Sequence, residues 1–213
     1  MRAGLVLAFA VLAAFAAEAA AQDEHRRRLA AEVTIMAGDL RRLETATEPP
    51  LRLDGLRARL AGALASLPLL MRRAGADAGA VSGLRDALAR RDWRSMRTGL
   101  RALQDAHPFD ARAPLPAEGT PAQLRVGEAI HRQACAGCHD APPVATRLPA
   151  LNLFEEAKRM PREEFAARLL LGVRGDRSTA YRNPFSDLEL AALIATYEHG
   201  EPAAVAAPRS PMT

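Results

Sequence analysis

Residues 135–139 read CAGCH and contain the only two cysteines of the 213-residue chain. With two residues between them, the cysteines lie on one helical turn, which presents both sulfur atoms to the same side. A C-x-x-C-H run is the attachment site of a c-type haem, whose vinyl groups take up the two thiols. We therefore expect one covalent haem c, held through Cys135 and Cys138, with His139 as the proximal ligand of its iron.

Three other kinds of site use cysteines at this spacing: zinc sites, redox-active dithiols and structural disulfides. A zinc site requires a second pair of Cys or His ligands, and the chain contains no further cysteine. A thioredoxin-like dithiol requires a βαβ context, and no strand pattern surrounds residues 135–139. Haem attachment is therefore favoured, with a structural disulfide as the alternative.

The first 21 residues have the pattern of a secretory signal peptide. Arg2 is followed by an uncharged apolar stretch, residues 5–17, and then by alanine-rich sequence up to Ala21. A retained membrane anchor is the alternative, but the apolar stretch is shorter than the ~20 residues that a bilayer span needs. We expect cleavage after Ala21, a mature chain without a membrane span, and a periplasmic location.

Residues 22–107 have the periodicity of amphipathic helices and predict a small helical bundle. Apolar residues recur every three or four positions in four stripes, which run over residues 29–43, 53–67, 81–88 and 93–103. We expect Pro49-Pro50 to end the first helix and Pro68 to kink or end the second, because proline lacks a backbone donor. Asp92 is the expected N-cap of the fourth helix.

Proline and charge define the rest of the chain. Three prolines, with Gly119 directly after them, mark residues 108–118 as a linker, and three prolines mark residues 201–213 as a disordered tail. The formal net charge is +4, and residues 22–112 contain 17 Arg against 12 Asp and Glu. Since this exported chain lacks interleaved aromatic residues, we expect no nucleic-acid binding. The sequence does not indicate an oligomeric state.

Residues 119–200 resemble the class I c-type cytochrome domain. Gly127 lies eight residues before Cys135, where the family has a glycine that lets its first helix cross the last one closely. His131 lies four residues before Cys135, where the family usually has an aromatic residue. The resemblance implies that His131 packs at the helix crossing, with a role as second iron ligand as the alternative. It also implies an all-α fold, a helical bundle followed by a cytochrome c-like haem domain.

The resemblance continues in the last helix and in the loop after His139. Ser186 followed by Glu189 is typical of a helix N-terminus, and Ile194 with Tyr197 resembles the family's aliphatic–aromatic pair on the last helix. Pro149 resembles the family's proline whose carbonyl accepts a hydrogen bond from the proximal imidazole. Pro142-Pro143 is the nearer alternative, but residues 148–151 resemble the family's proline–leucine segment better.

The sequence departs from the family on the distal side of the expected haem. The family usually has a methionine in the loop before the last helix, but residues 172–184 contain no methionine, histidine or lysine. Met160, just before an expected middle helix over residues 162–171, is the only methionine of the haem domain and the candidate sixth ligand. Tyr181, Asn183, a water molecule or an open position are the alternatives.

Two functions follow from the expected haem. The first is single-electron transfer, as a soluble carrier or the cytochrome subunit of an oxidoreductase, with redox proteins as partners and no catalytic residue of its own. The second is an open-site haem protein that binds a small ligand or has peroxidase-like activity, for which Arg174, Arg177 and Arg182 are candidate distal residues. The sequence has no convincing distal base, which favours electron transfer over an enzyme. A class II cytochrome is excluded, because the first half has no cysteine.

Overall fold

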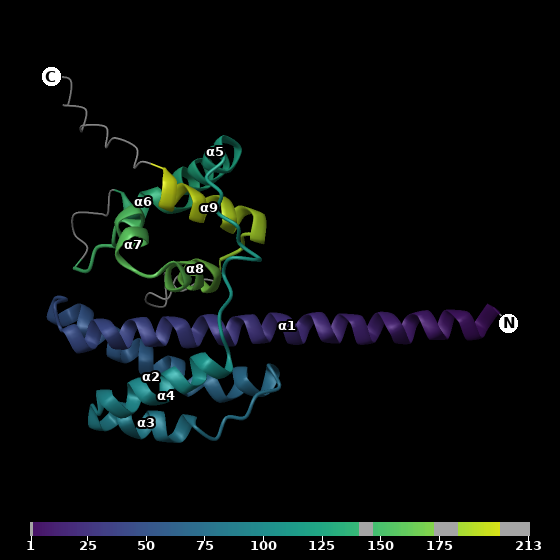
Figure 1. The fold of residues 1–213 in the computed structure, drawn as a ribbon, viewed down its shortest axis with the longest axis horizontal. Coiled ribbons are helices and arrows are strands. Elements are labelled where there is room, and N and C mark those ends of the chain that lie inside the picture. The colour runs from purple at the N-terminus through teal and green to yellow at the C-terminus, as the bar shows by residue number, and fades with distance from the viewer. Residues whose placement is uncertain (1, 141–146, 173–182, 201–213) are drawn as a thin grey trace. The chain divides into compact units, whose positions relative to one another are not determined.

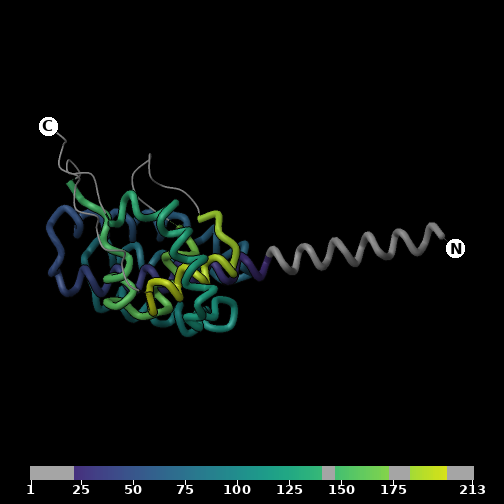
Figure 2. The backbone as a smooth tube through the Cα atoms, turned by 90° about the horizontal axis from the view of Figure 1, so that it is seen from above, coloured from purple at the N-terminus to yellow at the C-terminus, as the bar shows by residue number. Residues whose placement is uncertain are grey.

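The computed structural model of the chain describes residues 2–140, 147–172 and 183–200, with side chains from Gln22 onward. Within these residues all regular structure is helical and no strand occurs, which confirms the all-α class (Figure 1). The backbone, traced in Figure 2, divides into two compact units, Met1–Phe109 and Asp110–Thr213. No helix in the described part is both long and apolar enough to cross a membrane.

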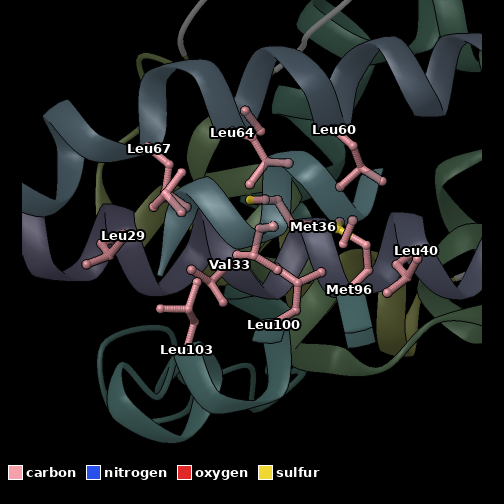
Figure 3. Close-up of a cluster of buried hydrophobic side chains, with 14 of the residues drawn as sticks. Leu29, Val33, Met36, Leu40, Leu60, Leu64, Leu67, Met96, Leu100 and Leu103 are labelled. Carbon is pink, nitrogen blue, oxygen red and sulfur yellow. The ribbon is translucent and has the colours of Figure 1, made fainter. Parts of the chain in front are cut away.

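Four helices build the first unit around one apolar core. They are α1 (Arg2–Thr45), α2 (Pro50–Arg73), α3 (Val81–Arg90) and α4 (Trp93–Ala106). Helix α1 packs against α2 and α4, and α3 packs against the same two helices. The predicted stripes supply the core, since leucines and methionines of α1, α2 and α4 point toward one another in Figure 3. The predicted helical bundle is therefore present in this unit.

The proline positions in the first unit differ in part from the prediction. Helix α1 ends at Thr45, ahead of the two prolines, and Pro50 instead begins α2, where its fixed φ suits the first turn. Helix α2 runs through Pro68, so an end at that residue was wrong. Proline cannot donate the hydrogen bond due to the Leu64 carbonyl. Arg85 of α3 donates to that carbonyl instead, from Nε at 3.1 Å and Nη2 at 2.9 Å.

Polar groups in the first unit stabilise helix ends and one buried ion pair. Asp92 caps α4 as predicted, because its Oδ1 accepts from the Ser95 amide at 3.1 Å. Hydrogen bonds from the Ser95 hydroxyl, at 2.6 Å to Oδ2, and from this amide lower the pKa of the Asp92 carboxyl. Arg59 of α2 pairs with Asp39 of α1 and lies 4.0 Å from Glu32. Both carboxylates are buried, and this guanidinium contributes to the compensation of their charge.

The second unit contains the helices α5 (Pro121–Ile130), α6 (Ala136–His139), α7 (Leu153–Arg159), α8 (Arg162–Leu171) and α9 (Asp187–His199), with the π-helix η1 (His131–Cys135) between α5 and α6. Helix α9 packs against α5, α7 and α8 and is the centre of the unit. Helix α8 coincides with the predicted middle helix, which is confirmed. Helix α7 was not predicted, although Asn152 caps it by accepting from the Phe154 amide at 2.9 Å.

Gly127 is the point where α5 and α9 cross. A Cβ atom at this position would lie 2.6 Å from the Ala192 carbonyl carbon and closer still to the Ala192 oxygen and Thr196 Oγ1. Thr196 Oγ1 also donates to the Leu124 carbonyl across the crossing, at 3.2 Å. The predicted reason for a glycine at position 127 is therefore confirmed, since any side chain would separate the two helices.

Helix α9 begins and packs as its sequence indicates. Ser186 and Glu189 form a reciprocal capping box at its start. Eight consecutive residues of α9, from Leu190 to Tyr197, are buried, including Ile194. Tyr197 packs with Phe154, Phe165 and Leu193 in the core of this unit. Of the two residues expected to form an aliphatic–aromatic pair on the last helix, both are buried and Tyr197 belongs to this core.

The expected linker is hydrogen-bonded to the second unit at its far end. The carbonyls of residues 115, 116 and 117 accept hydrogen bonds from Arg162, Gln123 and His199, over 2.8, 3.0 and 3.3 Å. These bonds come from α8, α5 and α9, so residues 115–117 are fixed to three helices. The predicted tail, residues 201–213, lies outside the described residues.

Candidate functional site

The CAGCH sequence lies where a π-helical turn passes into a short α-helix. Cys135 ends η1 and has φ −119°, and the remaining four residues form α6. Single π-turns of this kind are frequent at functional sites. Cys135 is partly buried and Cys138 is exposed, and both thiols are free. The structure therefore holds the two thiols without the disulfide that the sequence left as an alternative.

His139 is held by its Nδ1 atom, which lies 2.6 Å from the Leu151 carbonyl oxygen. A carbonyl only accepts, so Nδ1 carries the proton, and Nε2 is left with the lone pair of the neutral ring. Fixing a histidine in this way is the usual means by which proteins orient a metal ligand and raise its basicity. The side chain of His139 is thus prepared to bind a metal through Nε2.

The expectation for Pro149 was wrong in the position of the accepting carbonyl. The acceptor is Leu151, two residues further along the chain. Leu151 directly precedes Asn152, the N-cap of α7, so its carbonyl lies outside the helix and is not engaged in helical hydrogen bonds. Because the sequence did not predict α7, it offered no reason to prefer this carbonyl. Pro149 is exposed.

His131 is buried, with 2% of its surface exposed, and uses both ring nitrogens. Its Nε2 lies 2.9 Å from Asp140 Oδ2 and its Nδ1 lies 2.8 Å from the Tyr197 hydroxyl. A carboxylate only accepts, so Nε2 donates to Asp140, and in the neutral ring Nδ1 accepts from the Tyr197 hydroxyl. The ring also contacts Phe154 and Tyr197 edge-on. His131 therefore belongs to the helix crossing, and the alternative that it ligates iron is contradicted, because neither nitrogen is free.

The Cys135 thiol and the Tyr197 hydroxyl are both kept protonated by their surroundings. Burial raises the pKa of the Cys135 thiol, and an interaction with the Tyr197 hydroxyl offsets part of this rise. Burial is also the main reason why the pKa of Tyr197 is raised, and the neighbouring Cys135 adds to it. Both groups are accordingly neutral near pH 7, and the thiol is not reactive by itself.

The candidates for the sixth iron ligand are only partly covered by the described residues. Met160 follows α7 directly and packs against the aromatic core formed by Phe154, Phe165 and Tyr197. Asn183 donates from Nδ2 to the Leu169 carbonyl at 2.7 Å, and its Oδ1 is buried without a partner in the described part. Tyr181 lies outside the described residues. So do Pro142, Pro143 and the three distal arginine candidates, Arg174, Arg177 and Arg182.

The donor groups at this site fit a covalent haem better than a bare metal ion. Among the described residues, no three His, Cys, Asp or Glu side chains come together in a way that could hold a metal. What CAGCH supplies is one oriented imidazole nitrogen and two free thiols. A haem c needs this set, since the porphyrin provides the other four nitrogen ligands of its iron.

Comparisons of the chain with protein-family models, with curated proteins and with solved structures found no match. Three features of the site were missed in the sequence: the Leu151 acceptor, the Asp140 carboxylate and the His131–Tyr197 hydrogen bond. Only Asp140 had a local signal, because it directly follows His139. The other two depend on how segments far apart in the chain come together.

Proposed function

We propose that this chain is an exported mono-haem c-type cytochrome that transfers single electrons, as a soluble carrier or as the cytochrome subunit of an oxidoreductase. The observation that carries the proposal is the hydrogen bond from His139 Nδ1 to the Leu151 carbonyl, within a C-x-x-C-H sequence. A histidine oriented in this way is suited to bind iron through Nε2, next to two thiols that can hold the porphyrin.

We further propose that the second unit is a class I cytochrome c domain. Support comes from the close crossing of α5 and α9 at Gly127, from Tyr197 on the last helix, and from α8 at the place of the family's middle helix. The attachment sequence follows the first helix of this crossing directly, as it does in the family. These features concern helix packing and the order of elements, and are independent of the cysteines themselves.

The roles of the residues follow from their chemistry. Bound haem supplies an iron that exchanges one electron. Cys135 and Cys138 would fix the porphyrin covalently, and His139 would bind the iron, with the Leu151 carbonyl holding the imidazole in one tautomer. The partly buried apolar residues around the aromatic core, which include Leu153, Met160 and Leu169, would keep water from part of the cofactor. Redox proteins are the proposed partners.

An open-site haem protein is the second candidate, and the position of Met160 favours it. Met160 packs against the aromatic core of its own unit and follows α7 rather than α8. A chain without a thioether ligand would have an accessible sixth position and a lower reduction potential, since thioether ligation favours ferrous iron. Such an iron binds carbon monoxide readily, whether its role is electron transfer or ligand binding.

Expression with a haem-attachment machinery tests the proposal. We expect an intact mass equal to the chain from Gln22 onward plus one haem, and a c-type spectrum. A mass equal to the bare chain would refute haem binding, and an unprocessed N-terminus would refute the export signal. In His139→Ala, the thioether bonds should persist while the iron becomes high-spin. The native spectrum in this variant would show that His139 is not the ligand.

Carbon monoxide and peroxide separate the two candidate functions. Rapid binding of carbon monoxide without peroxidase turnover is the result expected of an electron-transfer protein with a loosely held sixth ligand. Sustained peroxidase turnover would favour the enzyme. A sulfur-to-iron charge-transfer band that disappears in Met160→Ala would instead make the protein an ordinary His/Met carrier.

A further inference from the structure

His131 connects the end of the CAGCH sequence to the last helix of the second unit. Its Nε2 lies 2.9 Å from Asp140 Oδ2, and its Nδ1 lies 2.8 Å from the Tyr197 hydroxyl. Asp140 directly follows His139 and is the C-cap of α6, where its amide donates to the Ala136 carbonyl at 2.9 Å. The two nitrogens of one imidazole therefore join the residue after the expected iron ligand to α9.

The surroundings of His131 leave its ring little freedom to turn. The side chain is 2% exposed and lies edge-on to Phe154 of α7 and to Tyr197, which is itself fully buried. Asp140 Oδ1 is buried without a partner in the described part of the chain, so the carboxylate receives its one side-chain hydrogen bond there from His131. The position of Asp140 thus depends on the ring that donates to it.

The backbone around His139 needs such an attachment. Helix α6 is four residues long, and no side chain among the described residues caps its start. A helix of this length is not stable by itself in water. The Leu151 carbonyl, 2.6 Å from His139 Nδ1, fixes the imidazole, but it orients the ring only as far as the backbone of residue 139 is fixed. Because neighbouring Cα atoms are about 3.8 Å apart, a hold on Asp140 is also a hold on that backbone.

We infer that His131 is a positioning residue for the metal ligand His139 and acts through its hydrogen bond to Asp140. That His139 binds haem iron rests on the proposed function, whereas the hold on Asp140 belongs to the chain without haem. This role differs from the one that the family resemblance implies for position 131, where an aromatic residue packs at the helix crossing. A hydrocarbon ring would fill the same space but could neither donate to Asp140 nor bond to the Tyr197 hydroxyl.

Two substitutions at position 131 separate the hydrogen bonds from the packing. His131→Phe retains a ring in the aromatic core but loses both polar atoms. His131→Gln loses the ring, while its amide retains a nitrogen that can donate to Asp140 and an oxygen that can accept from Tyr197. A residue that acts only by packing tolerates Phe better than Gln. A residue that positions Asp140 by hydrogen bonding tolerates Gln better than Phe.

The first readout is backbone hydrogen exchange of the full chain without haem, measured by mass spectrometry on peptides that contain α6. Since the loss of one hydrogen bond changes a local opening equilibrium by about a factor of ten, we expect α6 to exchange roughly tenfold faster in His131→Phe and less than about threefold faster in His131→Gln. Peptides of α8 report the stability of the unit as a whole and should exchange at the native rate in both variants. Native exchange of α6 in His131→Phe, or a larger effect of Gln than of Phe, would overturn the role of His131.

Asp140→Ala keeps the test decisive if His131→Phe unfolds the unit and α8 exchanges faster as well. This variant removes the acceptor from a side chain that is 24% exposed and leaves the His131 ring in the core. We expect it to increase the exchange of α6 to the same extent as His131→Phe, with α8 unchanged. Native exchange of α6 in Asp140→Ala would show that the His131–Asp140 bond does not fix α6.

The second readout applies to the chain loaded with haem. In the ferric state, the pattern of the haem methyl proton shifts in NMR depends on the orientation of the axial histidine ring, which a loss of stability alone does not change. We expect the native pattern in His131→Gln and an altered or doubled pattern in His131→Phe. A native pattern in His131→Phe would overturn the action on His139. A native chain that takes up no covalent haem would refute the proposed function, while the exchange of α6 would still decide whether His131 fixes the end of CAGCH.

Discussion

Replacement of Gly127 by alanine tests the helix crossing on which the second unit is built. The new Cβ atom would lie 2.6 Å from the Ala192 carbonyl carbon, and the Ala192 oxygen and Thr196 Oγ1 would be nearer still. An ordinary contact between such atoms is about 3.5 Å, so the two helices must move apart by roughly 1 Å. The obstacle includes backbone of α9, which cannot turn away as a flexible side chain would.

The expected loss of stability in Gly127→Ala is the difference between two opposing effects. Overpacking of a dense core costs about 1–3 kcal/mol, and a clash with backbone belongs at the upper end of that range. Alanine in place of glycine inside a helix returns up to about 1 kcal/mol. We therefore expect Gly127→Ala to reduce the free energy of unfolding of the second unit by about 2 kcal/mol. For a unit of this size that corresponds to a fall in Tm of roughly 8–16 °C.

Hydrogen exchange, measured by mass spectrometry on peptides from α5 and α9 of the intact chain, reports the stability of the second unit separately from that of the first. Gly137→Ala is the matched control, because a Cβ at Gly137 meets nothing within 4 Å. We expect peptides of α5 and α9 to exchange faster in Gly127→Ala and at the native rate in Gly137→Ala. Native or slower exchange in Gly127→Ala would refute the reasoning, since the crossing would then have room for a methyl group.

Three further predictions concern the first unit. Arg85→Ala should reduce the free energy of unfolding, measured in urea, by about 1–3 kcal/mol. The Leu64 carbonyl, to which Pro68 cannot donate, would then lack the Arg85 donor, whereas Arg90→Ala should have little effect. Equal effects of these two variants would contradict the role of Arg85. Arg59→Ala should reduce the free energy of unfolding by about 3–5 kcal/mol, because it removes the guanidinium that pairs with the buried Asp39 and lies 4.0 Å from the buried Glu32; a loss below about 1 kcal/mol would argue against that pairing. Asp92→Ala should lower the urea midpoint at pH 7. Since the folded state lowers the pKa of this carboxyl below 3.8, the stabilisation is present above that value, and the difference between native and variant should vanish as the pH falls below it. A difference that is independent of pH would show that the carboxylate is not the stabilising group.

Much of the helical structure could be predicted because its determinants are local. Apolar residues three and four positions apart define the stripes of the first unit, and these stripes form its core. The caps at Asp92 and Ser186 depend on groups three residues away, so the short-range sequence was sufficient to identify them. Pro68 shows the limit of this reasoning. Its local effect argues for a helix end, but the guanidinium of Arg85 compensates for the missing donor, and only the packing of α3 against α2 places it there.

In the candidate site, the sequence alone determined which groups can bind and react. The CAGCH run supplies both thiols and the imidazole within a single turn, because its chemistry requires neighbours in the chain. What the tertiary structure decided is how those groups are held. The carbonyl that orients His139 comes from Leu151, twelve residues on, and the hydroxyl that meets His131 comes from Tyr197, 66 residues on. Hydrogen bonds over such separations depend on which helices cross and at what depth, and no local propensity or spacing contains that information.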